Sequence, residues 1–299
     1  MSRVGCIGEC MVELALPASG SAAGFGFAGD SFNTAVYLKR TGGGAVSVAY
    51  VTAIGTDPLS DRMLSALQAE DLDTDLVERR ADRLPGIYAI ATDAAGERSF
   101  SYWRETSAAR TLFDPPAEVT LERLEPFDLL YLSGISIAIL TEGVRERLLA
   151  FLRGWTERGG AIAFDSNYRP KLWPDEAAAR FWMDAYWKVS EVGLPSLDDE
   201  AALFGDADPE AVIDRLRRSG VRRGALKCGW RGPLPIGPCE DLPAFGRAAS
   251  VVDTTAAGDS FNGAYLARML AGASESACLL AGHEMACKVI AEPGAIIPR

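Results

Sequence analysis

Residues 253–259, with the sequence DTTAAGD, place two acids around a run of small residues, and an apolar, helix-like segment follows at once. Ala256, Ala257 and Gly258 are small enough to leave their backbone N–H groups open to a ligand, and a following helix adds the positive end of its dipole. Such a turn suits a phosphate, and the Asp259 carboxylate at the helix start can accept a hydroxyl proton. A second interpretation is equally consistent with these residues: Asp259 only caps the helix, and the alanines only fill a tight turn.

The rest of the composition narrows the chemistry. His283 is the one histidine of the chain. A histidine-rich metal site would need several histidines, and a Ser/His/Asp triad would have to use this one, so we expect neither. No lysine follows a glycine, which excludes a P-loop. The six cysteines show no CxxC spacing, and we interpret them as reduced thiols of a cytoplasmic protein. A general base is therefore expected to be a carboxylate.

Length and charge limit the kinds of partner. The 299 residues suffice for one large α/β domain, and 48% hydrophobic residues are typical of a globular protein. A net charge of -11 argues against nucleic acid and against an anionic membrane, since both attract a basic face. No apolar run has the length of a membrane span, and acids interrupt the apolar part of the N-terminus, so we expect neither a membrane helix nor a signal peptide.

The elements that must position these residues alternate along the chain. Apolar runs predict buried strands, and stretches with N-cap residues and helical apolar spacing predict helices between them. This alternation predicts a mostly parallel sheet with helices on both faces. The expected strands are residues 46–55, 128–134, 160–167, 189–195 and 224–229, and the expected helices are residues 30–40, 57–70, 141–158, 175–187 and 208–220.

Two segments depart from that alternation. Residues 86–104 are expected to form two strands joined by a turn at residues 93–97, a small β lid of the kind that covers active sites. Gly24, Gly26 and Gly29 fit the G-x-G-x-x-G dinucleotide pattern, but no acid lies near position 50 to bind a ribose. We therefore interpret these glycines as a flexible loop that leads into a helix at Asp30.

The DTTAAGD segment resembles the C-terminal signature of the ribokinase-like, or PfkB, carbohydrate kinases, usually written DTxGAGDxF. The resemblance covers essentially the whole chain, with further family segments at residues 8–9, 29–42, 55–64, 226–232 and 294–298, the last being the family's final strand. It implies one domain over residues 1–299 with the three-layer ribokinase-like fold, an α/β fold with a mostly parallel sheet. The lid would comprise mainly residues 86–104 with part of the N-terminal segment.

Four details are similar to the family members that act on 2-keto-3-deoxygluconate, a sugar acid. They are Ala256, where most relatives have glycine, and residues 99–105, 165–174 and 281–298. A sugar acid needs a guanidinium for its carboxylate, and Arg104 and Arg169 both stand beside aromatic residues. By resemblance the substrate side comprises Tyr88, Tyr102 and Arg104 of the lid, Arg169 of the sheet, Gly29, Asp30 and Asn33 of the first helix, and Asp259. From the residues alone the tyrosines can simply pack, and Arg169 can hold a loop through a salt bridge.

The nucleotide side rests on the segment LKCGWRG, in which two glycines between expected strands allow a close approach of the backbone to a ligand. An ordinary hairpin turn is equally consistent with it. By resemblance the residues that bind ATP are Asn167, Ser196, Lys227, Gly229, Gly232, Ala256, Gly258 and His283. For His283, a structural role as the cap of a core helix is as consistent as an adenine contact. In the family's N-x-x-E region, which helps hold Mg²⁺, Ser196 replaces the Asn, and Asp199 or Glu200 can supply the acid through water.

These residues predict in-line transfer of the γ-phosphoryl group of ATP to a primary hydroxyl of a sugar acid. Asp259 acts as the base, the amides of residues 256–258 stabilise the developing charge, and closure of the lid excludes water. The alternatives are a kinase for fructose, ribose or a nucleoside, and a non-catalytic sugar-acid sensor on the same fold. A role for a monovalent cation such as K⁺ stays open. Exposed strand edges of the lid predict a homo-oligomer, a dimer or higher.

Overall fold

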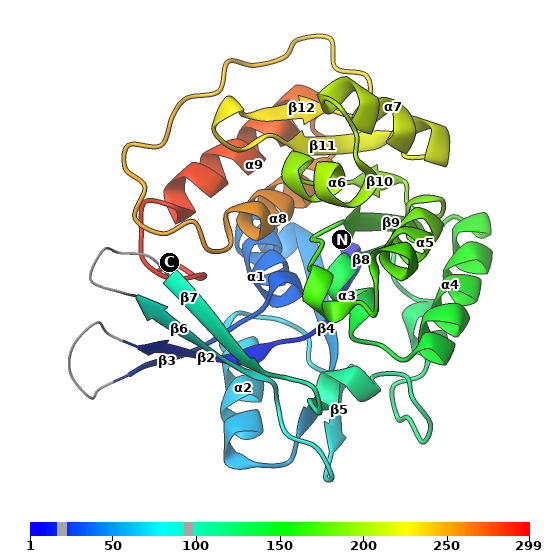
Figure 1. The fold of residues 1–299 in the computed structure, drawn as a ribbon, viewed down its shortest axis with the longest axis vertical. Coiled ribbons are helices and arrows are strands. Elements are labelled where there is room, and N and C mark those ends of the chain that lie inside the picture. Colours follow the sequence, from blue (N-terminus) through cyan, green and yellow to red (C-terminus); the bar gives the residue numbers. More distant parts are fainter. Residues whose placement is uncertain (17–22, 93–97) are drawn as a thin grey trace.

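The computed structural model describes residues 1–16, 23–92 and 98–299, and an eight-stranded sheet forms the centre of this part (Figure 1). Its order is β12-β11-β10-β9-β8-β1-β4-β5. All neighbouring strands run parallel except β11 and β12. In chain order the strands are β1 (Ser2–Ile7), β4 (Val46–Gly55), β5 (Val77–Arg80), β8 (Leu129–Ser133), β9 (Ala161–Asp165), β10 (Val192–Gly193), β11 (Arg223–Lys227) and β12 (Pro233–Pro235).

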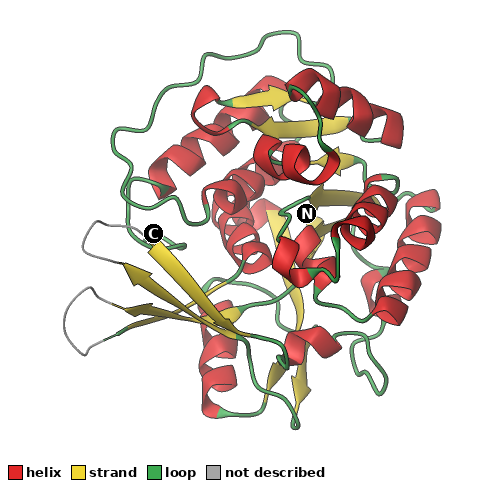
Figure 2. Ribbon diagram, viewed as in Figure 1, coloured by secondary structure: helices red, strands yellow, loops and turns green. Residues whose placement is uncertain are grey.

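Helices cover both faces of this sheet, as the sequence predicted (Figure 2). One buried cluster joins the sheet to α4, α5, α6 and α7, and a second joins it to α1, α2, α8 and α9. The central strands are buried on both sides, which explains why they appear as continuous apolar runs. The helices are α1 (Asp30–Gly42), α2 (Pro58–Ala69), α3 (Gly134–Ala138), α4 (Glu142–Glu157), α5 (Glu176–Trp187), α6 (Leu197–Phe204), α7 (Pro209–Ser219), α8 (Ala257–Leu270) and α9 (Glu275–Val289).

The starts of the helices fall into two kinds. Asp57, Asp175 and Asp208 accept backbone N–H groups at the first turns of α2, α5 and α7, which are ordinary N-caps. By contrast α1 begins after Gly29 and α8 after Ala256, and neither residue has a side chain that can cap. The free N–H groups of these two first turns are therefore left to other partners.

A second, four-stranded sheet projects from the main body (Figure 1). Its order is β3-β2-β6-β7, from β2 (Met11–Leu16), β3 (Gly24–Ala28), β6 (Ile87–Thr92) and β7 (Arg98–Trp103). The interpretation of residues 24–29 as a flexible loop is wrong, because Gly24 and Gly26 pair with Ala15 and Glu13 in an antiparallel ladder. The alternating Phe25 and Phe27 supply the period-two pattern of a strand, and Phe27 packs against the core cluster beneath the sheet.

Most other expected strands and helices are confirmed, and two strands are shorter than expected. The strands expected at 46–55, 128–134 and 224–229 and all five expected helices are present within one or two residues. Residues 189–195 contribute only the two-residue β10, and β9 ends at Asp165. The turn expected at residues 93–97 lies outside the described residues. Residues 294–298 are not a strand, because Tyr37 Oη donates to the Ala295 carbonyl and accepts from the Ile297 amide, in place of a ladder.

Two further observations concern the whole described part. Within it, no helix has both the length and the apolar character needed to cross a membrane. All six cysteines lie in it and are free thiols, and burial raises the pKa of Cys6 and Cys10 well above that of an ordinary thiol.

Candidate active site

The uncapped starts of α1 and α8 meet at the carboxyl ends of β8 and β9 (Figure 1). The two helices pack closely because Gly263 has no side chain, and a Cβ there would lie 2.7 Å from the Thr34 carbonyl oxygen. Gly29 permits a similar approach, since its Cβ would lie 2.2 Å from the Glu9 carbonyl oxygen. In a parallel sheet this edge is where ligands bind.

Asp259 lies in the first turn of α8 and is half-buried. Its Oδ2 accepts a hydrogen bond of 2.8 Å from Asn33 Nδ2, so its side chain binds α1 and does not cap its own helix. The interpretation of Asp259 as only an N-cap is therefore wrong. Desolvation by the surrounding protein, followed by the neighbouring charge of Asp30, raises the pKa of Asp259 to about 7, although Asn33 and Lys227 oppose the rise. A carboxylate with this pKa is suited to accept a proton near neutral pH.

Asp30 and Asn167 join the same group of side chains. Asn167 Nδ2 donates to Asp30 Oδ2 at 2.9 Å, which links the loop after β9 to the start of α1. The structure thus brings Gly29, Asp30, Asn33 and Asp259 together, as the sequence analysis expected. Asn167, expected to bind the nucleotide, lies with them through its hydrogen bond to Asp30.

The turn before α8 has the geometry of an anion site. Ala256 adopts a left-handed conformation with φ 58°, and the first helical hydrogen bond runs from Ser260 N to its carbonyl. The N–H of Ala257 donates to the Thr254 carbonyl at 3.3 Å and is already occupied. Gly258 and Asp259 are left with N–H groups that the helix itself cannot satisfy. Of the expected residues 256–258, Gly258 is therefore the one whose N–H group stays open, and Asp259 adds a second.

Lys227 lies directly against this turn. Its Nζ donates to Asp165 Oδ2 at 2.7 Å and to Asn262 Oδ1 at 3.1 Å, and a Cβ on Gly258 would lie 3.4 Å from it. Asn262 in turn donates to Asp165 Oδ2 at 2.6 Å. The glycine at 258 thus leaves room for an ammonium group beside the open amides of α8.

The residues of the second sheet form an aromatic and ionic wall. Tyr88 and Tyr102 are directly cross-strand, with ring centroids 5.9 Å apart; Tyr88 is buried and Tyr102 is exposed. Tyr88 donates to Glu13, and that charge together with burial raises the phenol pKa. Arg104 is buried and forms an ion pair with Glu9, whereas we expected it to face a substrate carboxylate. Its Nε has no hydrogen-bond partner within the described residues.

Arg169 and the first turn of α6 occupy the other side. Arg169 is half-exposed, and its Nη1 lies 3.4 Å from Asp199 Oδ1, as in the salt bridge considered from the sequence. Ser196 caps α6 by accepting the N–H of Asp199. Burial raises the pKa of Asp199 despite the opposing charge of Arg169.

Glu200, the other acid expected to support magnesium, is paired with an arginine. Its carboxylate is fully buried and forms an ion pair of 2.6 Å with Arg215, and burial raises its pKa to about 7. Asp199 is the more exposed of the two acids considered for magnesium. Across residues 1–16, 23–92 and 98–299, no group of three or more His, Cys, Asp and Glu side chains is arranged to hold a metal ion.

Gly229, Gly232 and His283 are the remaining residues expected to bind the nucleotide. Gly229 and Gly232 have positive φ values of 56° and 82°, which glycine adopts without strain. A Cβ on Gly232 would lie 2.7 Å from the Phe245 ring, and that ring lies 5.0 Å from His283. His283 lies within α9, so it does not cap that helix, and its Nε2 contacts the Gly246 carbonyl. The Phe245 ring thus lies between Gly232 and His283.

Three residues of the site were missed from the sequence as functional positions: Asp165, Asn262 and Glu9. Asp165 ends a predicted strand at the edge where ligands bind, which was a usable signal. Asn262 lies three residues after Asp259 and so on the same side of the helix. The pairing of Glu9 with Arg104, 95 positions apart, has no local signal.

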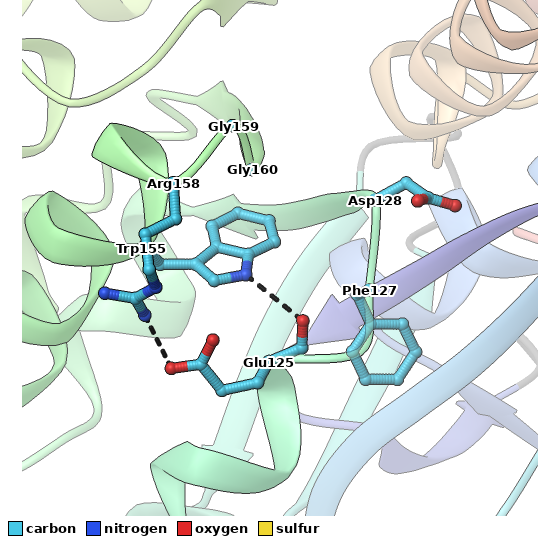
Figure 3. A pocket seen from close by; sticks show the side chains of 7 residues that line it. All are labelled: Glu125, Phe127, Asp128, Trp155, Arg158, Gly159 and Gly160. Carbon is cyan, nitrogen blue, oxygen red and sulfur yellow. Dashed lines mark hydrogen bonds and ion pairs between the residues drawn. The ribbon is translucent and has the colours of Figure 1, made fainter.

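Two hollows lie away from this site. One, of about 570 Å³, is lined by the last turns of α1 and α9 and by the C-terminal residues. The other, of about 240 Å³, lies at the opposite edge of the sheet, before β8 and β9, and is lined by Trp155, Arg158 and Glu125 among others (Figure 3). Neither contains the side chains described above, and neither brings an acid together with open helix amides.

Comparisons with known proteins show the family of the chain. The profile of the family described as pfkB family carbohydrate kinase matches residues 1–299. The 2-dehydro-3-deoxygluconokinase of Escherichia coli (strain K12) is 43% identical over 303 residues, which cover 99% of this chain and 97% of that protein. The enzyme of the same name from Dickeya dadantii is 42% identical with the same coverage.

Solved structures show the same fold at lower identity. A putative Ribokinase II from E. coli in complex with ATP and Mg²⁺ has a TM-score of 0.86 at 20% identity, covering 99% of this chain and 94% of that one. The 2-dehydro-3-deoxygluconokinase of Thermotoga maritima has a TM-score of 0.79 at 20% identity, covering 99% and 96%.

Proposed function

Because the chain belongs to the pfkB family of carbohydrate kinases, we propose that it transfers the γ-phosphoryl group of ATP to 2-dehydro-3-deoxygluconate, also called 2-keto-3-deoxygluconate. The observation that carries the chemistry is the Asp259 carboxylate, with its raised pKa, beside the open amides of α8. The substrate assignment is supported by full-length relatives of that name at 42–43% identity.

The proposed reaction transfers one phosphoryl group from ATP to the sugar acid. The primary hydroxyl oxygen of the sugar acid forms a bond to the γ-phosphorus, and the bond from that phosphorus to the β–γ bridging oxygen breaks to give ADP. Asp259 takes the hydroxyl proton, and Asn33 holds its carboxylate toward the site through the 2.8 Å bond. The N–H groups of Gly258 and Asp259 stabilise negative charge on the phosphoryl oxygens.

The cationic side chains support an acidic sugar. Arg169 is half-exposed at the sheet edge and can exchange its long contact to Asp199 for a substrate carboxylate. Arg104 is held by Glu9, so any contact that it makes to the sugar is through the remaining donors of its guanidinium. Tyr88 and Tyr102 provide a stacked wall on the same sheet. This sheet is proposed as the lid that excludes water.

Magnesium is expected to bind mainly through the phosphates of ATP. Asp199 fits a supporting role through water, because its carboxylate is partly exposed at the start of α6 and adjoins Arg169. The metal would supply charge neutralisation of the phosphates. Ser196, Gly229, Gly232 and His283 are proposed to bind the nucleotide. Ser196 pairs with Lys227, the two glycines follow Lys227 in the chain, and the Phe245 ring lies between Gly232 and His283.

A substrate panel tests the function and separates it from the second candidate, a neutral-sugar kinase. ADP release would be measured with purified protein, MgATP, and 2-dehydro-3-deoxygluconate, fructose or ribose. We expect kcat/KM for the sugar acid to exceed that for either neutral sugar by at least about 100-fold, the effect of one charge-assisted contact of roughly 3 kcal/mol. Equal or greater turnover of fructose would favour the second candidate. No ADP release with any sugar would favour the non-catalytic sensor.

Three further proposals concern the oligomeric state, the cellular compartment and the cation requirement. We propose a homo-oligomer formed through the small sheet, whose edge strand β7 exposes Phe100 and Trp103, and light scattering would reveal a monomer if this is wrong. We place the enzyme in the cytoplasm, where six free thiols stay reduced. A monovalent cation requirement would be tested by replacing K⁺ with tetramethylammonium in the same assay.

A further inference from the structure

Lys227 and Asp165 form a buried ion pair at the ends of two strands. Lys227 ends β11 and Asp165 ends β9, and the Nζ to Oδ2 distance is 2.7 Å. The side chains are only 13% and 4% exposed. Asn262 of α8 bonds both partners, at 3.1 Å to Lys227 and 2.6 Å to Asp165. The pair therefore ties two strands of the sheet to the helix that carries Asp259.

The ammonium group has a donor to spare at the turn before α8. An ammonium has three N–H donors, and the described residues take two of them through Asp165 and Asn262. The same Nζ would lie 3.4 Å from a Cβ on Gly258, next to the N–H groups that α8 cannot satisfy. Two kinds of donor, ammonium and amide, thus converge where a phosphoryl group would be held.

Stability alone does not account for such a pair. Removing two charges from water costs free energy, and a buried ion pair is often no more stabilising than apolar residues of the same volume. The pair is adjacent to Asp259, whose own carboxylate lies near Asp30 and Asp165. A cation held at this point offsets that accumulation of negative charge when a phosphoryl group enters.

We propose that Lys227 binds the transferring phosphoryl group through its ammonium, and that Asp165 is a positioning residue that holds this ammonium at the first turn of α8. The inference rests on the proposed kinase function and specifies one part of it. Lys227 makes and breaks no covalent bond: the oxygen–phosphorus bond forms, the bridging bond to ADP breaks, and the proton goes to Asp259. Asp165 touches neither substrate and acts through Lys227.

The two partners act on Asp259 in opposite directions, which makes the proposal testable. The charged and titratable groups that face Asp259 are Asp30 and Tyr37 of α1, Tyr131 of β8, Asp165 of β9 and Lys227 of β11. The Asp165 charge raises the pKa of Asp259, and the Lys227 charge lowers it. The rate should therefore be lost on acidification at a lower pH without Asp165 and at a higher pH without Lys227.

The experiment measures kcat and its pH dependence for D165N and K227M with the sugar that the wild type uses best. For K227M we expect kcat to fall by roughly 10²–10³-fold, as for loss of a transition-state donor. Its acidic limb should move up by about half a pH unit or more. For D165N we expect a smaller fall of about tenfold, because the ammonium stays but is no longer fixed, and its limb should move down.

A matched control is the exposed pair of Lys188 and Asp184, at 2.6 Å on α5. D184N and K188M change the net charge of the protein by the same amounts, and we expect wild-type kcat and an unmoved limb. A wild-type kcat in K227M, or limbs that move in the same direction in both site variants, would overturn the proposal. D165N preserves the side-chain volume. If K227M fails to fold, the direction in which the acidic limb of the D165N pH profile moves therefore tests the proposal. Failure of the kinase function itself would show as absent turnover in the wild type.

Discussion

The two edges of the main sheet carry similar ion pairs in different surroundings. At the amino edge, Arg158 and Glu125 lie 2.5 Å apart beside a hollow of about 240 Å³, with side chains 54% and 45% exposed (Figure 3). At the carboxyl edge, Lys227 and Asp165 lie 2.7 Å apart with side chains 13% and 4% exposed. Distance alone does not distinguish the two pairs.

The difference lies in what solvent does to each charge. Water and salt screen the pair at the amino edge, so it contributes little and perturbs nothing nearby. At the carboxyl edge desolvation raises the pKa of Asp259, and the charges of Asp30 and Asp165 raise it further because the low local dielectric screens them little. The two edges therefore differ in the burial of like charges around Asp259, and not in the presence of an ion pair.

The largest effect is expected at Asp259. In D259N the base is lost and the hydrogen-bonding shape is kept, so kcat should fall by roughly 10²–10⁴-fold while the KM for the sugar changes little. Steady-state kinetics of ADP release would check this, with circular dichroism as the folding control. A D259N enzyme with more than a tenth of the wild-type kcat would remove the main contrast between the edges.

Substitution of Arg169 tests whether the exposure of an arginine or its position at the sheet edge determines its contribution to substrate binding. Its side chain is 52% exposed, as open as that of Arg158, but it lies at the carboxyl edge. We expect R169M to raise the KM for the sugar acid by roughly 10–100-fold, the loss of one charge-assisted contact, with kcat within a few-fold. Initial rates across sugar concentrations measure both constants. A KM unchanged in R169M would mean that exposed cations at both edges are equivalent.

The pH dependence gives an intermediate effect. Asp259 acts only when deprotonated, so the wild-type kcat/KM should fall as the pH drops through about 7. Asn33 donates to the charged carboxylate and lowers its pKa, so in N33A the pKa rises and the acidic limb should move upward by roughly half to one unit. Rates from pH 5.5 to 9 would show it. A downward movement would contradict the assigned hydrogen bond.

The smallest effect is expected at the amino edge. R158M removes one partner of an exposed pair and should change the free energy of unfolding by about 0–1 kcal/mol, with kcat and KM unchanged. Urea unfolding and the ADP assay measure these. A tenfold loss of activity in R158M would show that the amino edge of the sheet is also coupled to the active site.

The sequence predicted the alternation of strands and helices because their apolar periodicity and caps are local properties. It led us to propose Asp259, Asn33 and Lys227 as site residues because they lie within segments that resemble family motifs, and the structure brings the three together. It could not predict that Arg104 pairs with Glu9, or that Glu200 turns away toward Arg215, since those partners are set by packing between distant elements. It also misassigned Gly24 and Gly26, whose neighbours Phe25 and Phe27 favour a strand through contacts outside the segment.

The most direct test of this account is a titration of Asp259 itself. Carbon-13 labelling of the aspartate carboxyl groups, with D259N to assign the resonance, would follow its protonation in the free enzyme. We predict a midpoint near 7, well above the ordinary range of an aspartate side chain. A midpoint near 4 would contradict the claim that burial and neighbouring carboxylates prepare this residue to take the substrate's proton.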